Sequence, residues 1–162
     1  MTGDKLFDCT EMFRHACSFS DCADFCFERE NRINYVQPEI VNSSLACEVF
    51  LKAICHYHDI DLKPLIKKKH GHSLKALYEA IPTQIQKDIN RKVGVGDDRD
   101  LKDAFGFDYL DKISNSFEDW RYSYEHKNLS SETWFLIRFR NALRDVCCLL
   151  FYKTTWDEYK RR

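Results

Sequence analysis

Apolar residues recur at intervals of three and four along most of the chain, and this spacing constrains the fold more than any other feature. It is clearest in one aromatic stretch, where the recurring positions are Leu110, Ile113, Phe117, Trp120 and Tyr124. Side chains spaced in this way lie on one face of an α-helix, whereas a half-buried strand needs strict alternation. We find no convincing strand pattern, low-complexity segment or internal repeat. The sequence therefore predicts an all-α protein.

The apolar pattern divides the chain into about five helices, as in an up-and-down bundle. The first helix is expected over about residues 9–29, and its pattern allows a break near 18–20. A connection follows over residues 31–38, where a proline favours extended geometry. Asn42-Ser43-Ser44 is expected to cap the second helix, which ends near residue 58.

The third helix is expected to open at His72 or Ser73. Pro82 interrupts it, because a proline in a helix interior removes a backbone donor and clashes with the preceding turn. Thr83 is then expected to cap a continuation.

The fourth and fifth helices carry the remaining apolar stripes. The fourth is expected over about residues 107–125, and Ser130-Ser131 is expected to cap the long fifth helix. The tail, residues 156–162, is charged and aromatic, and we expect it to fray. The positions of the other helices that we expect to face the core are Ala46, Val49, Phe50, Ala53, Ile54, Tyr57, Leu74, Leu77, Tyr78, Ile81, Ile85, Ile89, Phe135, Phe139, Leu143, Val146, Cys147, Leu150 and Phe151.

Length and composition favour one globular domain over residues 1–162. The chain has 162 residues, of which 44% are hydrophobic and 14% aromatic, so it can bury a core of ordinary size. Lys and Arg number 25 against 26 Asp and Glu, which leaves a formal net charge of −1. A protein coated with positive charge for nucleic acid would be more basic. Any contact with RNA must therefore come from a local patch.

The eight cysteines are expected to be reduced thiols of a cytoplasmic protein. The start of the chain contains no apolar signal core, and the longest uncharged apolar run, residues 146–152, is too short to cross a membrane. Cys17, Cys22 and Cys26 with His15 could form a zinc site. However, no C-x-x-C pair is present, and Cys22 and Cys26 have the spacing of one helical face. We favour buried free thiols, and we expect no metal and no cofactor.

Arg121 and His126 are the residues that most suggest chemistry. On an unbroken helix their side chains would point about 140° apart, but both could face one cleft if the helix ends near Glu125. A fixed guanidinium beside a group that titrates near neutral pH suits phosphodiester cleavage without a metal. The alternatives are an ion pair of Arg121 with Glu118 or Glu125, and a His126 that only caps the helix dipole.

Other charged and aromatic residues have both plain and functional interpretations. Lys67-Lys68-Lys69 belongs to the most basic stretch, which is usually a solvated turn but would be the first candidate for phosphate contacts. Trp120, Tyr122 and Tyr124 are more typical of a core or dimer interface than of a base-stacking platform. Glu48 and Lys52 are four residues apart on the second helix, which is typical of a solvated ion pair. The glycine loop over residues 94–98 lacks the features of a phosphate cradle.

Three segments resemble the HEPN superfamily of small helical bundles. Residues 44–54 are similar to the family's first conserved helix, which carries a small residue, a Glu and a Lys. Residues 69–77, which read Lys-His-Gly-His-Ser-Leu-Lys-Ala-Leu, are similar to the opening of its next helix. The Arg121 to His126 segment matches the family signature of Arg, four to six residues, then His. The resemblance covers about residues 44–150 and leaves residues 1–37 as an additional N-terminal helix and connection.

This resemblance implies a two-fold homodimer that brings both Arg/His pairs into one cleft. It implies a metal-independent endoribonuclease of phage defence, toxin–antitoxin systems or RNA processing, with RNA and a cognate antitoxin or regulatory protein as partners. His126 would be the acid/base, and Arg121 would stabilise charge on the phosphate. Glu125 could orient the histidine or simply lie at the surface. Cleavage would leave a 2′,3′-cyclic phosphate. The residues expected to contact the substrate are Lys67, Lys68, Lys69, Tyr122 and Lys127.

The chain departs from the family pattern at two positions. Tyr122 follows Arg121 where active members often have a small polar residue. Asn128 stands two residues after His126, where the toxin subgroup that is silenced by tyrosine modification has a tyrosine. The competing hypothesis is therefore a catalytically inactive HEPN-like module for dimerisation or protein interaction. A regulatory bundle with an enclosed, aromatic-lined pocket is a third alternative.

Overall fold

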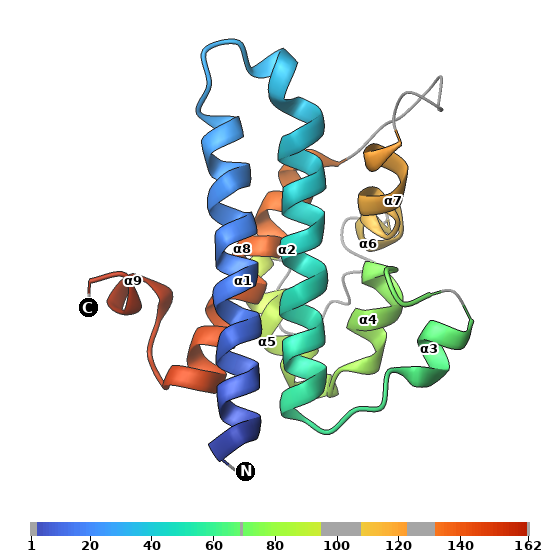
Figure 1. Ribbon diagram of the computed structural model, residues 1–162, viewed down its shortest axis with the longest axis vertical. Helices are drawn as coiled ribbons and strands as arrows, with labels where there is room; N and C mark the ends of the chain where they lie inside the picture. The colour runs from blue at the N-terminus through green and yellow to red at the C-terminus, as the bar shows by residue number, and fades with distance from the viewer. Residues whose placement is uncertain (1–2, 69, 95–107, 123–131, 162) are drawn as a thin grey trace.

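A computed structural model describes residues 3–68, 70–94, 108–122 and 132–161. All regular structure in these ranges is helical, so the predicted all-α class is confirmed. Helices α1 (Gly3–Phe27) and α2 (Val36–Tyr57) lie side by side in opposite directions and are joined through the short 3-10 helix η1 (Arg32–Tyr35) (Figure 1). Helix α8 (Thr133–Tyr152) packs against both of them.

The shorter helices complete the helical bundle. On the side of α2 away from α1, α4 (Leu74–Ala80) and α7 (Ser116–Arg121) contact α2, and α6 (Tyr109–Ile113) packs on α4 (Figure 1). Helix α3 (Lys63–Lys67) precedes α4, and α5 (Thr83–Val93) packs on α8. The last element, α9 (Trp156–Tyr159), follows α8.

The core forms where the apolar stripes of α1, α2, α4, α5, α6 and α8 meet. Most of the positions that we expected to face it are buried. Val49, Tyr57, Phe117, Trp120 and Leu150 are half-buried, and Tyr124 lies outside the described ranges. The ring of Phe13 links the first helix to the end of the chain. Its ring neighbours are Phe50, Phe151, Tyr152, Trp156 and Tyr159.

The tail over residues 156–161 is therefore not a frayed end, as the sequence suggested. Trp156 and Tyr159 lie 6.2 and 5.7 Å from Phe13, measured between ring centroids. The side chain of Thr155 accepts a hydrogen bond from the backbone of Glu158, whose carboxylate accepts one from the backbone of Thr155. This reciprocal capping box closes the start of α9, while the rings anchor it.

Helix α1 runs without a break through residues 18–20, and it begins before the predicted start. Ser18 donates a side-chain hydrogen bond to the Arg14 carbonyl, 3.1 Å away, within the helix. Ser20 faces inward, and its hydroxyl accepts a hydrogen bond from Arg144 of α8 at 3.1 Å. The two serines thus have partners that let the helix continue, although serine often marks a helix end.

Helix α2 starts at Val36, so the predicted cap at Asn42-Ser43-Ser44 is wrong. Pro38 lies in the first turn, where its missing N–H has no intrahelical partner to lose. The Asn42 amide donates a hydrogen bond to the Pro38 carbonyl at 2.7 Å. The supposed connection is partly 3-10 helix and partly the first turn of α2.

The predicted fourth helix is interrupted between Ile113 and Ser116. The Ser114 hydroxyl is hydrogen-bonded to the Ser73 hydroxyl at 2.7 Å, and its carbonyl accepts a bond from the Leu74 N–H at 2.9 Å. These bonds tie the junction of α6 and α7 to the start of α4, and the chain turns there. The last predicted residues of this helix, 123–125, lie outside the described ranges.

The start of α4 was predicted correctly, since Ser73 caps it by accepting a hydrogen bond from the Ala76 N–H at 3.2 Å. Pro82 separates α4 from α5, also as expected. Thr83 is the first residue of α5 and makes no capping hydrogen bond, so its predicted role is wrong. The predicted cap of α8 at residues 130 and 131 lies outside the described ranges.

None of the helices in the described ranges has both the length and the apolar character needed to cross a membrane.

Candidate functional site

Arg121 is the last residue of α7, and its side chain is exposed to solvent. The guanidinium carbon lies 5.5 Å from the centroid of the Phe117 ring and 4.7 Å from that of the Tyr122 ring. Cation–π contacts of this kind hold an arginine in place without neutralising its charge. Within the described residues, no carboxylate forms an ion pair with Arg121. The alternative pair with Glu118 is thus not formed, and Glu125, the other alternative partner, lies outside the described ranges.

Tyr122 follows directly and belongs to the same surface. Its hydroxyl oxygen accepts a hydrogen bond from Nη2 of Arg121, and its side chain is 37% exposed. Trp120, by contrast, is half-buried and packs against the core, as the apolar stripe predicted. Tyr122 was expected in the core or in a dimer interface, and it does not belong to the core, because it lies at the surface beside Arg121.

Two hydrogen bonds, one near each end of α7, hold this helix against the rest of the bundle. The amide of Gln37, in the first turn of α2, donates a hydrogen bond to the Trp120 carbonyl at 3.1 Å. At the other end of α7, the Ser73–Ser114 contact described above holds its junction with α6. The position of Arg121 is thus set by α2 and α4 as well as by its own helix.

His72, just before α4, lies next to α7 and contacts α2. Its ring centroid is 6.0 Å from that of Phe117. Its Nδ1 atom lies 3.0 and 3.1 Å from the two carboxylate oxygens of Glu48. Lys52 donates a hydrogen bond to the same carboxylate at 2.6 Å. The imidazole therefore lies between a buried carboxylate and a half-buried aromatic ring.

Glu48 is not the solvated partner that the sequence suggested, because it is 4% exposed. A buried carboxylate must be paired and hydrogen-bonded to offset its lost hydration, and Lys52 and His72 provide both. The spacing of residues in the sequence could have predicted that Glu48 is buried. Ser44, Glu48, Leu51 and Cys55 have helical spacing, and all four are buried on α2.

The segments that resembled the HEPN superfamily thus meet on one face of the bundle. Glu48 and Lys52 come from the first, His72 from the second, and Arg121 is the first residue of the third, with Phe117 four residues before it. Together they form what we call the His72–Arg121 face, defined by these five residues. Chemically it offers a cation for anionic oxygens and an imidazole for proton transfer.

The remaining predicted site residues are only partly described. Lys67 is the last residue of α3 and Lys68 follows it, and both side chains are exposed. No described contact joins these two lysines to the His72–Arg121 face. Of the other predicted residues, Lys69, Glu125, His126 and Lys127 lie outside the described ranges.

The cysteines do not form a reactive or metal-binding centre in the described residues. All eight are free thiols, and no group of three or more His, Cys, Asp or Glu in the described part of the chain is placed to hold a metal ion. Burial raises the pKa of Cys55 to about 11 and that of Cys17 to about 12. Thiols with such raised pKa values are poor nucleophiles at neutral pH. Cys22 is exposed, which differs from the predicted burial.

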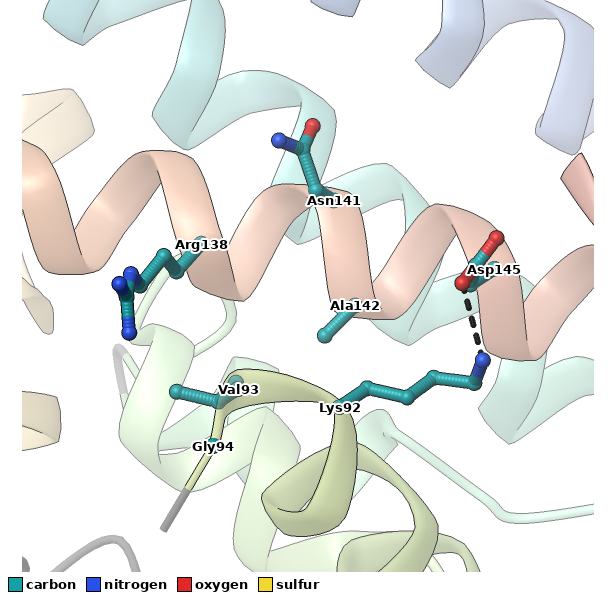
Figure 2. Close-up of a pocket in the computed structure, with 7 residues that line it drawn as sticks. All are labelled: Lys92, Val93, Gly94, Arg138, Asn141, Ala142 and Asp145. Atoms are coloured by element: carbon teal, nitrogen blue, oxygen red, sulfur yellow. Dashed lines mark hydrogen bonds and ion pairs between the residues drawn. The ribbon is translucent and has the colours of Figure 1, made fainter. Parts of the chain in front are cut away.

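A separate hollow of about 330 Å³ lies between the end of α5 and α8. Lys92 reaches across it to Asp145 at 2.9 Å, and Arg138 lies at its other end (Figure 2). The guanidinium of Arg138 also lies 5.8 Å from the ring of Trp134. The hollow is open and its lysine is already paired, so it is not the enclosed aromatic pocket that a ligand-binding regulatory bundle requires.

We compared the chain with known proteins in three ways. No family model, no curated protein and no solved structure matches it. The features of the chain that bear on its function are therefore the His72–Arg121 face and the sequence resemblance.

Proposed function

We propose that this protein is a metal-independent endoribonuclease of the HEPN type, in which Arg121 and His126 act on a phosphodiester of RNA. The observation that carries the proposal is the state of Arg121. Its guanidinium is exposed, is held against two aromatic rings, and has no carboxylate partner within the described residues. Structural arginines of a helical bundle are usually paired with acids, whereas this one is available to an anion.

The chemistry needs only the groups that this part of the sequence provides. Arg121 binds the phosphate oxygens and stabilises the charge that develops on them in the transition state. His126, five residues later, transfers a proton at the 2′-hydroxyl or at the leaving oxygen, and Glu125 orients it. The products are a 2′,3′-cyclic phosphate and a 5′-hydroxyl, and no metal or cofactor takes part.

The proposal includes a cytoplasmic homodimer in which a two-fold axis places both Arg/His pairs in one cleft. Lys67, Lys68, Lys69 and Lys127 supply local positive charge for the RNA backbone, which a chain of net charge −1 needs. Tyr122 contacts the substrate beside Arg121. A cognate antitoxin or regulatory protein controls the activity in phage defence, a toxin–antitoxin system or RNA processing.

One observation favours a second candidate, a catalytically inactive HEPN-like module for dimerisation or protein interaction. The Tyr122 hydroxyl already accepts a hydrogen bond from Arg121. If this contact persists when RNA is present, the guanidinium has one fewer donor for phosphate. The same surface would then serve as an aromatic and cationic contact for another protein.

Incubation of a mixed RNA pool with the purified protein in EDTA, followed by end-group analysis, tests the proposal. We expect the wild type to cut and to leave cyclic-phosphate ends, and we expect Arg121→Ala and His126→Ala to abolish cutting. Arg138→Ala is the matched control for the arginine, because Arg138 is also exposed and also lies against an aromatic ring. His15→Ala, exposed on α1, is the control for the histidine.

Two results would contradict the endoribonuclease. Failure of the folded wild-type dimer to cut any RNA in the pool would favour the interaction module. Cutting that persists in His126→Ala would place the chemistry on other residues.

A further inference from the structure

The contact between Glu48 and His72 determines the state of the imidazole. An ionised carboxylate has no proton to donate, so Nδ1 of His72 is the donor to the two oxygens at 3.0 and 3.1 Å. In the neutral ring the lone pair is then on Nε2. The side chain of His72 is 52% exposed, so the imidazole is accessible to a ligand. The pair therefore presents a proton acceptor in a fixed orientation.

The negative charge of Glu48 can be balanced without His72. Lys52, on the same helix, already lies 2.6 Å from the carboxylate. The second contact holds the imidazole in one orientation and stabilises the imidazolium once it forms. An acidic residue that orients a histidine in this way is what makes the histidine an effective base.

His72 and Arg121 are neighbours of the same aromatic ring. Phe117 lies 6.0 Å from the His72 ring and 5.5 Å from the Arg121 guanidinium. The described charged groups that face His72 are Glu48 and Lys52 from α2 and, across Phe117, Arg121 from α7. The imidazole and the guanidinium therefore have one aromatic ring as a common neighbour, and this is the geometric basis for assigning both to one substrate.

We propose that His72 is a second proton-transfer residue of this site, that Glu48 is its positioning residue, and that the substrate is a phosphodiester with a free 2′-hydroxyl. This inference rests on the proposed ribonuclease function. His72 Nε2 takes the proton of the 2′-hydroxyl, and the oxygen attacks phosphorus. The bond from phosphorus to the 5′ oxygen breaks as that oxygen receives a proton from His126. Charge and atoms balance, and exchange with water restores both histidines.

The test compares the RNA-cleavage kinetics of wild type, His72→Ala, His72→Gln and the matched control His70→Gln. His70 lies in the same turn, is exposed and makes no described contact with Glu48. We expect kcat to fall by about 100-fold or more in both His72 variants, with KM within about twofold, because general base catalysis contributes on that scale. His70→Gln should cut like the wild type. Circular dichroism melts of each variant establish that it is folded.

Two further measurements separate proton transfer from a structural role. Free imidazole should restore part of the cutting by His72→Ala, and the rate decrease of the wild type at acidic pH should be absent from His72→Gln. Glu48→Gln should lower kcat with little change in KM.

The outcomes distinguish this inference from the proposed function. If the wild type cuts, His126→Ala does not, and folded His72→Ala cuts at the wild-type rate, His72 has no catalytic role and the ribonuclease proposal stands. The same conclusion follows if imidazole gives no rescue and the acidic limb persists in His72→Gln. If the wild type does not cut, both proposals fail together.

Discussion

Arg140 has the largest side chain among those that are fully buried in the described residues. Its Nη1 donates a hydrogen bond to the Ser43 hydroxyl at 3.1 Å, and its Nη2 donates one to the carboxylate of Asp24. A buried guanidinium keeps its charge, so its stability depends on a carboxylate partner. The contact joins α1, α2 and α8 at a single residue.

Replacement of Asp24 by Asn should therefore destabilise the bundle although it preserves the shape of the side chain. We expect the free energy of unfolding to fall by about 1–3 kcal/mol, which is the range for a hydrogen bond to a charged group. Urea melts measure this change. The control is Asp21→Asn on the same helix, where the carboxylate is exposed and makes no described ion pair. Equal losses in the two variants would show that Asp24 does not stabilise Arg140.

His58 should make the stability of the protein sensitive to mild acid. Its Nε2 is buried and has no hydrogen-bond partner within the described residues. Burial, followed by the nearby charge of Lys5, lowers the pKa of His58 in the folded protein. Below the unfolded pKa of about 6.5, the unfolded chain therefore binds more protons than the folded one. The contribution of His58 to stability is complete above that pH and is lost as the pH falls through the folded pKa.

His58→Gln should consequently show a smaller loss of stability than the wild type between about pH 7.5 and about pH 5, since Gln does not titrate. The measurement is a series of urea melts over this range. His15→Gln, which changes an exposed histidine on α1, should behave like the wild type. An unchanged pH dependence in His58→Gln would assign the acid sensitivity to other groups.

At the scale of single elements, α9 depends on its cap and on its rings. The Thr155 hydroxyl accepts a hydrogen bond from the Glu158 N–H at 3.3 Å, and the ring of Tyr159 packs at a tilt against that of Tyr152, 4.7 Å away between centroids. Because α9 has only four residues, its own backbone bonds contribute little and the cap matters more.

Thr155→Ala should lower the free energy of unfolding by about 1 kcal/mol, the usual cost of losing an N-cap side chain. Thr155→Ser keeps the oxygen and should cost less than about half of that. Thermal melts measure both variants, and Trp156 fluorescence reports the release of α9. If Ala and Ser are equivalent, the aromatic contacts hold α9 without the cap.

The existence of the main helices follows from the sequence, while several of their ends do not. The stripe from Leu110 to Trp120 has correct helical spacing, yet the helix is broken at Ser114, because that residue bonds to Ser73 and Leu74 in another part of the chain. No local pattern reveals such a partner. The short helix α3 was also missed, although Pro64 lies at one of its first positions, where proline is favoured.

In the candidate site too, a contact between residues close in the sequence was predicted, while a contact between residues far apart in the sequence was not. The pairing of Glu48 with Lys52 was predicted, because the residues are four apart on one helix. The contact of Glu48 with His72 spans 24 residues and depends on how α4 packs against α2, which periodicity does not determine. The contact on which the proposed role of His72 depends is therefore visible only in the fold.

At the scale of the whole molecule, the proposed function requires two copies of the chain to form one cleft. Such a cleft would contain two copies of Arg121 and two of His126, related by the two-fold axis. A dimer made from one Arg121→Ala chain and one His126→Ala chain would keep one intact arginine and one intact histidine in that cleft. Each mutant alone would lack one of the two groups completely.

We therefore expect partial restoration of RNA cutting when the two inactive variants are mixed, unfolded and refolded together. Random association gives about half heterodimers, so the mixture should recover a fraction of the wild-type rate, whereas each variant refolded alone should stay inactive. Refolding each variant with wild-type chain serves as the control for assembly, and analytical ultracentrifugation confirms the dimer. An inactive mixture that contains heterodimers would show that one Arg121 and one His126 from different chains are not sufficient for cutting. A monomer at all concentrations would exclude the shared cleft, because one copy of the chain has only one Arg121 and one His126.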